Sequence, residues 1–312
     1  MRMLAVCGRN GRALLVAGLL AGLIGGLVAP DAVAALRGLV APGIVGLLFL
    51  AVFRLGPAGV RAGLAGMRGA LAALAVLQLV LPCLAALGVA ALGLSGGTAL
   101  AVVLVLAAAP VTGGPNLAIL ARGDPAPALR ALVLGTLALP LTVLPVFALV
   151  PAFGDPQAVL GVVLRLVSVI GVAGGLALLA RCWIPGTPDR IAAIDGAAAL
   201  LLAGVVVALM GTAGPTLLTL SGWGLLALVA GLNLGLQLAA AMVARARGAD
   251  PVPYGIVAGN RNLALFLSVL PADQVAAIMP FVGLYQIPMY LTPVVMPRLY
   301  RALARSPAAS RQ

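Results

Sequence analysis

Histidine, lysine and glutamate are absent from this 312-residue chain, whose 19 basic residues are all Arg and whose seven acidic residues are all Asp. Without histidine, the chain lacks the commonest metal ligand and the commonest acid or base at neutral pH. Cysteine is scarce, and Cys7, Cys83 and Cys182 form no CxxC pair. We therefore predict no disulfide framework, no zinc or iron-sulfur site and no cofactor.

Charge of either sign is also rare, because only 8% of the residues are charged whereas 63% are hydrophobic. Soluble domains carry roughly 45–50% apolar and about 25% charged residues, and the mean hydropathy here is +1.21. At ~20 apolar residues for each membrane-spanning helix, the apolar content is enough for about ten spans. A large catalytic or nucleic-acid-binding domain outside the membrane is excluded.

Apolar runs bounded by charged residues, Pro and Gly give ten predicted membrane spans. These spans cover 12–30, 39–56, 70–92, 98–121, 128–150, 158–181, 192–214, 217–246, 251–271 and 274–297. The chain is therefore predicted to be an all-α membrane protein of ten transmembrane helices that is embedded in the lipid bilayer.

The arginines indicate which side of the membrane each loop faces. Fifteen of the 19 fall in the termini or in the loops that share their side, whereas the opposite side holds only Arg37. By the positive-inside rule both termini are cytoplasmic, and we predict a multi-pass protein of a bacterial-type inner membrane. The net charge of +12 is thus a topology signal and does not indicate a nucleic-acid partner.

The first predicted span has a competing interpretation as a signal peptide, because basic residues precede it and an Ala-Val-Ala sequence follows at 32–34. We favour a membrane span, since the apolar run over 13–29 is longer than the 7–15 residues typical of a signal-peptide core. GxxxG steps, which are typical of close helix packing, occur in this span and in the sixth, at Gly18, Gly22, Gly26, Gly171 and Gly175.

The fourth and ninth predicted spans are each interrupted by Pro and Gly. The first interruption reads PVTGGPN over 110–116, and the second reads PVPYGIVAGNRN over 251–262. Their final Asn residues are 146 residues apart, and the starts of the fifth and tenth spans are separated by the same distance in sequence. Because each half has five spans, we predict two inverted repeats, 1–150 and 151–312, in which spans four and nine are broken and cross.

Broken helices at equivalent positions of two inverted repeats are the strongest sequence indication of a transport site near the membrane midplane. Unwinding frees backbone N–H groups, which bind anions, and C=O groups, which bind cations. An Asn at such a break also fits a simple interhelical hydrogen bond. The predicted substrate-binding residues at the two breaks are Thr112, Gly113, Gly114, Asn116, Asn260, Arg261 and Asn262.

Arg261 is the most informative of these residues, because an Arg in the middle of a span is costly and needs a partner. Its guanidinium is expected to pair either with a substrate carboxylate or sulfonate, or with Asp195 near the end of span seven. Asp195 is the only carboxylate within a predicted span and hence the one candidate proton carrier. Arg130 is expected to extend to the cytoplasmic surface, and Arg165 in span six is assigned no role.

One short motif, Gly93-Leu-Ser-Gly-Gly97, matches the GxSxG pattern of serine hydrolases. That chemistry needs a histidine base, and the chain has none. The motif lies at the predicted turn between spans three and four, where Gly and Ser are ordinary residues. We therefore expect no enzymatic activity, and we predict a secondary transporter that moves a small organic anion.

The chain resembles the bile acid:sodium symporter superfamily, and in particular its bacterial members that are similar to the apical bile acid transporter. The similarity covers the ten-span layout and is densest at Gln78-Leu-Val-Leu-Pro82, at 110–123 and at 259–265. It implies a panel domain of spans 1, 2, 6 and 7 that moves against a core domain of spans 3–5 and 8–10. In this family the fourth and ninth spans cross inside the core domain.

The resemblance implies sodium ligands at three positions of this chain, Gln78, Asn116 and Asn260. Other ligand positions of the family lack an oxygen donor here, because its hydroxyl groups fall on Ala128 and Leu132 and its shared Glu falls on Val257. A Gln of the second break is replaced by Arg261, whose fixed positive charge repels sodium. We therefore expect Arg261 to take the place of the cation and to receive the anionic substrate, and we argue against sodium coupling.

Two other interpretations stay open at this stage. The auxin-efflux-like carriers share the crossed broken helices and move a carboxylate without sodium. A channel or a membrane protein that transports nothing belongs to a different class, and counterflow separates a carrier from both. The residues indicate an organic anion, but they specify neither its identity nor the direction of transport nor the oligomeric state.

Overall fold

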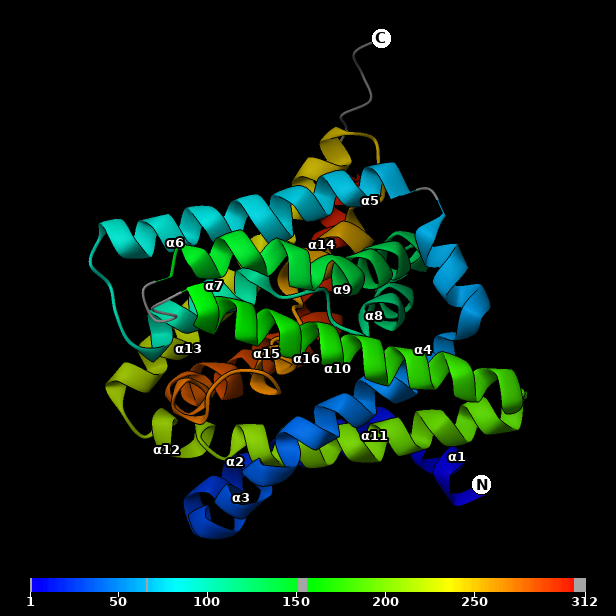
Figure 1. The fold of residues 1–312 in the computed structure, drawn as a ribbon, viewed down its shortest axis with the longest axis horizontal. Coiled ribbons are helices and arrows are strands. Elements are labelled where there is room, and N and C mark those ends of the chain that lie inside the picture. The colour runs from blue at the N-terminus through cyan, green and yellow to red at the C-terminus, as the bar shows by residue number, and fades with distance from the viewer. Residues whose placement is uncertain (1, 66, 151–155, 306–312) are drawn as a thin grey trace.

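A computed structural model of the protein describes residues 2–65, 67–150 and 156–305. Arg311 and the last residues of the C-terminus, which we assign to the cytoplasmic side, lie outside the described residues. The described chain is almost entirely helical (Figure 1), apart from one isolated β-bridge. Seven of its helices are long and apolar enough to cross a membrane, or eight if α1 and α2 form one bent span. The prediction of an all-α membrane protein is thereby confirmed, whereas ten spans in inverted repeats stays a prediction.

Residues 2–65 and 67–150 contain nine α-helices and two irregular helical segments. They are α1 (Arg2–Arg9), α2 (Gly11–Val28), α3 (Pro30–Leu36), the 3-10 turn η1 (Arg37–Leu39), α4 (Val40–Leu64), α5 (Met67–Leu74), the π-helical segment η2 (Ala75–Val80), α6 (Leu81–Ala91), α7 (Gly97–Ala107), α8 (Gly114–Leu120) and α9 (Pro125–Ala148). The segments α5, η2 and α6 follow one another without a gap. The GxSxG motif at 93–97 lies in the exposed turn between α6 and α7.

Residues 156–305 contain seven α-helices. They are α10 (Pro156–Trp183), α11 (Pro188–Met210), α12 (Ala213–Leu217), α13 (Leu220–Ala246), α14 (Pro251–Gly259), α15 (Ala264–Leu267) and α16 (Ala272–Arg305). Each of the ten predicted apolar ranges therefore coincides with helix. The fourth range contains the short helices α7 and α8, and the ninth contains α14 and α15, so both ranges are broken. The first break covers 108–113 and overlaps the predicted 110–116. The predicted second interruption over 251–262 is wrong in its position, because 251–259 is helix α14 with its prolines in the first turn, and the chain is irregular only over 260–263.

Two Asp-Pro sequences start helices α9 and α14 and connect their first turns. The Asp124 carboxylate accepts a hydrogen bond from the Ala126 N–H at 2.9 Å, and the Asp250 carboxylate accepts one from the Val252 N–H at 3.0 Å. Each Pro follows its Asp at the first helical position, where a missing N–H costs nothing. The second oxygen of Asp250 accepts the Asp124 N–H at 2.8 Å. This carboxylate therefore holds the ends of two helices together across 126 residues of sequence.

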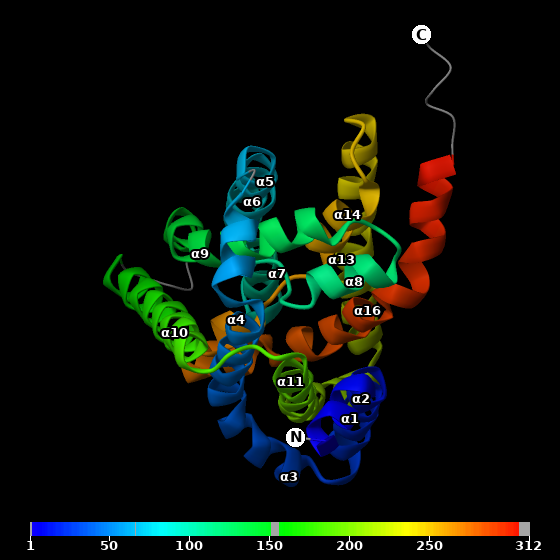
Figure 2. The same cartoon turned by 90° about the vertical axis from the view of Figure 1, so that its right-hand side faces the viewer.

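The helices pack in two groups around a buried centre. In one group, α1 and α2 lie against α11, and α4 lies against α10 and α11. In the other, α13 lies against α14 and α16, while α9 contacts α5, α8 and α14. Figure 2 shows α1, α2 and α11 below, with α13, α14 and α16 above them. Helix α7 is apolar on all sides and almost wholly buried, as expected of a helix in the middle of a protein.

The glycine steps of the first span form a close helix contact, as predicted. A Cβ atom added to Gly22 would lie 2.6 Å from both the Met210 Cβ and the Val207 carbonyl oxygen, and one at Gly26 would overlap the Gly211 carbonyl. Helix α2 can therefore approach α11 only because these positions carry no side chain. The same expectation for α10 is wrong, because a Cβ at Gly171 or Gly175 meets nothing within 4 Å.

Candidate functional site

The two broken helices meet inside the protein. The chain leaves helical conformation between α7 and α8 and again between α14 and α15, and the two breaks pair through an antiparallel β-bridge of Pro110 with Arg261. The Val111 N–H donates to the Asn260 carbonyl at 2.9 Å, and the Asn262 N–H donates to the Ala109 carbonyl at 2.8 Å. Backbone groups freed by unwinding thus bond to each other, as an unwound segment within a membrane requires.

The side chain of Arg261 is enclosed at this junction, with only 2% of its surface exposed. Its Nη2 donates to the Leu106 carbonyl at 3.0 Å and also to the Leu77 carbonyl. Leu106 belongs to the last turn of α7, and Leu77 belongs to η2. The guanidinium therefore binds two main-chain oxygens that come from two different helices, which is the role of a bound cation.

Two prolines explain why these carbonyls are free. In an α-helix the Leu106 carbonyl would accept the N–H four residues later, but that residue is Pro110, which has none. In η2 the helix widens, so the Leu81 N–H bonds to the Val76 carbonyl and not to that of Leu77. The next residue is Pro82, four positions after Gln78, and it has no N–H to offer to the Leu77 carbonyl. Both acceptors of Arg261 therefore follow from local sequence.

The guanidinium retains unused hydrogen-bonding capacity. Its Nε and Nη1 atoms are buried and have no hydrogen-bond partner among the described residues. A buried donor without a partner costs about 1–3 kcal/mol, and more when it is charged. The site therefore keeps a positive charge with donors to spare, and this is the arrangement that an anion satisfies.

Gln78 lies beside this junction on η2 and is completely buried. Its Nε2 donates to the Gly135 carbonyl at 2.8 Å and to the Thr142 hydroxyl at 3.1 Å, both on α9. Its Oε1 has no partner among the described residues. Gln78 therefore connects η2 to α9 through two interhelical hydrogen bonds, and its Oε1 remains a free acceptor.

Asn260 belongs to a buried cluster of neutral polar side chains on the opposite side of the second break. Its Nδ2 donates to the Ile256 carbonyl at 3.0 Å, and its Oδ1 accepts from the Thr292 hydroxyl at 3.1 Å. Gln237 on α13 donates to Thr292 at 2.9 Å and to Asn233 at 2.7 Å. This network fixes Asn260 between α13 and α16.

The end of α14 packs closely against the same cluster. The Gly259 carbonyl accepts hydrogen bonds from Asn233 Nδ2 at 2.6 Å and from the Tyr285 hydroxyl. A Cβ atom at Gly259 would overlap the Gln237 Cγ and the Asn233 carbonyl oxygen. Glycine is therefore required where α14 ends, because α13 occupies the space of a side chain.

The residues that support Asn260 were not among the predicted site residues, although their spacing in the sequence indicates that they share helix faces. Asn233 and Gln237 are four residues apart in an otherwise apolar span, so they share one helix face. Tyr285, Thr292 and Tyr300 are separated by seven and eight residues, which places them on one face of α16. Tyr300 donates to Gln237 at 2.8 Å. Polar side chains at helical spacing on two spans therefore predict a shared network.

The residues of the first break differ from those of the second in exposure. Thr112 and Asn116 are exposed, and no hydrogen bond joins either side chain to Asn260 or Arg261 in the described structure. A Cβ atom at Gly113 or Gly114 would meet nothing within 4 Å. The backbones of the two breaks are therefore brought together, whereas the polar side chains of the first break face accessible space. Asn262 is intermediate, being half-buried.

The expectation that Asp195 neutralises Arg261 is wrong. Asp195 on α11 pairs with Arg54 on α4, with 2.6 Å between Oδ1 and Nε, and both side chains are partly exposed. Asp195 therefore lies apart from the breaks, and its role as a proton carrier stays a prediction. Arg165 on α10 reaches the second broken span from outside, because its Nη1 donates a long 3.4 Å bond to the Val269 carbonyl.

The three residual sodium ligands do not form a cation site in the described structure. Asn116 is exposed on α8, the Oδ1 of Asn260 accepts from Thr292, and of the three only Gln78 keeps a buried side-chain oxygen without a partner among the described residues. Ala128 and Val257, the positions where the resemblance implies a hydroxyl and a carboxylate, are both in a buried apolar cluster. The donor set therefore does not fit sodium, and the guanidinium of Arg261 binds the carbonyls at this junction.

The paired breaks are the candidate site because they combine unwound backbone, an enclosed positive charge and unsatisfied donors. Each of these features is traced to particular residues of this chain. Comparison with known proteins finds no matching family model and no significant match among curated sequences.

Proposed function

We propose that this protein is a secondary transporter that moves a small organic anion by alternating access and without sodium coupling. The observation that carries the proposal is the pairing of two helix breaks around the buried guanidinium of Arg261. Irregular backbone is tolerated inside a membrane only where protein or water satisfies it, and such breaks are typical of transport sites. A fixed positive charge at the breaks favours an anionic substrate.

The proposed inverted repeat is supported by a hydrogen bond from a Gln amide to a Thr hydroxyl in each half of the chain. Gln78 of the third span donates to Thr142 of the fifth at 3.1 Å, and Gln237 of the eighth span donates to Thr292 of the tenth at 2.9 Å. Each amide therefore connects the two spans that flank a broken helix. Each half thus contains an amide-to-hydroxyl contact between the spans that flank its broken helix, which fits the predicted repeats 1–150 and 151–312.

Alternating access in this proposal is a movement between two groups of helices. The proposed panel domain consists of α2, α4, α10 and α11, and the proposed core domain consists of α5–α9 and α13–α16. Arg165 of α10 reaches the Val269 carbonyl that follows α15, so a bond joins the proposed domains near the second break. Movement of the panel domain would change access to the exposed face of Thr112 and Asn116.

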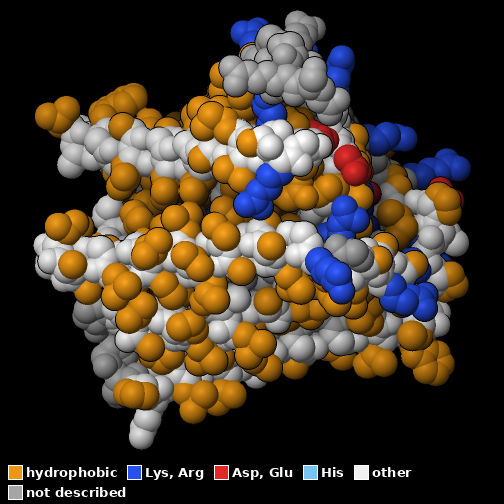
Figure 3. All heavy atoms as spheres, turned by 90° about the horizontal axis from the view of Figure 1, so that it is seen from above, with side chains coloured by type: hydrophobic (Ala, Val, Ile, Leu, Met, Phe, Trp, Pro, Cys, Tyr) orange, Lys and Arg blue, Asp and Glu red, His pale blue; other side chains and the backbone are white. Residues whose placement is uncertain are grey.

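The proposed orientation rests on the distribution of charge. In Figure 3 the Arg and Asp side chains visible on this face gather in the right half, and the left half is uncharged. In Figure 1 that end of the molecule contains the connections from α4 to α5 and from α10 to α11. By the positive-inside rule we assign this end to the cytoplasm of a bacterial-type cell.

Counterflow in proteoliposomes tests the proposal directly. Vesicles loaded with an unlabelled carboxylate or sulfonate are diluted into a trace of the same labelled anion, in a panel that runs from short keto acids to bile acids. A carrier accumulates label transiently above its equilibrium level, because exchange is faster than net flux. Steady current without accumulation would identify a channel, and no flux for any anion of the panel would leave a protein that transports nothing; either result overturns the proposal.

A further inference from the structure

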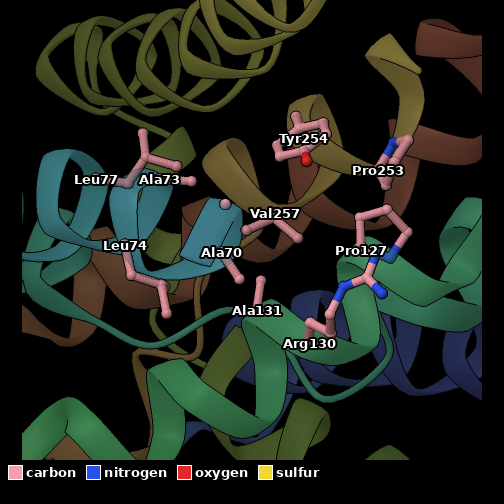
Figure 4. A pocket seen from close by; sticks show the side chains of 11 residues that line it. Ala70, Ala73, Leu74, Leu77, Pro127, Arg130, Ala131, Pro253, Tyr254 and Val257 are labelled. Carbon is pink, nitrogen blue, oxygen red and sulfur yellow. The ribbon is translucent and has the colours of Figure 1, made fainter. Parts of the chain in front are cut away.

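A pocket separate from the paired breaks opens between α5 with the start of η2, the beginning of α9, and α14. Its volume is about 170 Å³. Most of its lining is apolar and includes Leu74, Leu77, Ala131 and Val257, whereas Arg130 and Tyr254 are its polar side chains. Figure 4 shows that these residues come from three separate helices and surround one common space.

Arg130 is a cation without a partner in this pocket. Its side chain is half-buried, and no hydrogen bond or ion pair joins it to another described residue. In Figure 4 it extends from α9 towards Pro127 and α14, along the edge of the pocket. Tyr254 faces the same space from α14 and likewise has no hydrogen-bond partner among the described residues. A half-buried guanidinium that the protein does not neutralise is free to pair with the carboxylate of a ligand in the pocket.

The pocket is structurally connected to Arg261. Leu77 lines it with its side chain, and the carbonyl of the same residue accepts a hydrogen bond from Arg261. Val257 lines it one turn before Arg261 and belongs to α14, which ends at the second break. A ligand held here therefore lies one layer of residues from the paired breaks, on the side of the arginine-rich end.

We propose that this pocket binds a short-chain carboxylate, with its oxygens on Arg130 and Tyr254 and its hydrocarbon part against Leu74, Leu77 and Val257. A volume of about 170 Å³ is below the roughly 300–1,000 Å³ of pockets that hold drug-sized ligands, so a small ligand is expected. We assign the pocket a role in loading the transported anion, and this role rests on the proposed transport function. Binding itself is independent of transport and is measured separately.

Isothermal calorimetry on the purified full-length protein in uncharged detergent tests this site with butyrate and with the neutral analogue butyramide. Butyrate is expected to bind, and butyramide to give no heat. Arg130→Gln is expected to weaken butyrate binding roughly tenfold or more. The matched control is Arg68→Gln, which removes the same charge from an exposed position on α5 next to the pocket lining. Equal weakening by both variants would mean non-specific attraction and would overturn the proposal.

A second variant and a lipid competitor keep the test decisive. Gly69 lines the pocket, and a Cβ atom added there meets nothing within 4 Å, so Gly69→Ala places a methyl group at the pocket lining without a clash. Gly69→Leu extends that side chain further and is the stronger test. It is expected to reduce butyrate binding roughly tenfold at unchanged thermal stability. Loss of butyrate heat on adding phosphatidylglycerol, but not phosphatidylcholine, would assign the pocket to a lipid phosphate and overturn the proposal. Butyrate binding without counterflow of any anion would support the pocket and contradict only the transport function.

Discussion

Arg261→Gln is expected to abolish anion counterflow and to lower the unfolding temperature. The substitution removes the donor that holds the carbonyls of Leu77 and Leu106, both of which are free because of nearby prolines. Each hydrogen bond to a charged group contributes about 1.5–3 kcal/mol, and removal of Nε and Nη1, the two donors without a partner among the described residues, offsets part of that loss. Loss of the positive charge also removes the attraction for the anion. Thermal unfolding in detergent and counterflow in vesicles measure the two effects separately.

Two further variants distinguish the guanidinium from charge alone. Arg261→Lys keeps the charge but places a single ammonium at the junction, so we expect intermediate stability and weak counterflow. Arg165→Gln removes another guanidinium from a membrane-spanning helix, but it loses only one bond of 3.4 Å between the proposed domains, so it should reduce counterflow far less than Arg261→Gln. If Arg261→Gln transported anions at the rate of the unmodified protein, Arg261 would have no role at the site.

Gly259→Val is expected to reduce counterflow by about tenfold or more and to destabilise the protein. Any Cβ at this position overlaps atoms of Gln237 and Asn233, so α13 must move away from the end of α14. That movement stretches the 2.6 Å bond from Asn233 to the Gly259 carbonyl and disturbs the cluster around Asn260. Overpacking of a tight core costs about 1–3 kcal/mol.

The matched control for this prediction is Gly235→Val, which is also a glycine-to-valine change in a helix of the membrane domain. Gly235 belongs to α13, is exposed, and would place its Cβ in open space. It should leave both the unfolding temperature and counterflow nearly unchanged. Equal effects of the two substitutions would show that helix propensity, and not the contact between α13 and α14, determines the result.

The existence of a break in each apolar range was predictable from sequence, but only the position of the first break was. The Pro and Gly residues at 110–115 overlap the first break, which covers 108–113, whereas those at 251–259 form helix α14 and the second break follows at 260–263. The contact of Gly22 with α11 was equally predictable, since small residues four apart are typical of close helix approach. Local rules also explain why the carbonyls of Leu77 and Leu106 are free.

The partners of the site residues were not predictable, because they depend on tertiary packing. Charge alone suggested Asp195 as a partner for Arg261. In the structure Asp195 pairs with Arg54, and Arg261 donates to two backbone carbonyls. The polar residues of the first break looked equivalent to those of the second, yet Asn116 is exposed whereas Asn260 is buried. Proximity along the chain does not reveal which side chains point inward.

Initial rates of anion uptake with and without a sodium gradient test the central claim most directly. Proteoliposomes of the unmodified protein are assayed with the same external anion in sodium medium and in choline medium of equal ionic strength. Because the guanidinium of Arg261 binds the carbonyls at the junction and the expected sodium ligands do not come together, we predict equal rates in the two media. Uptake that requires the sodium gradient would contradict this account.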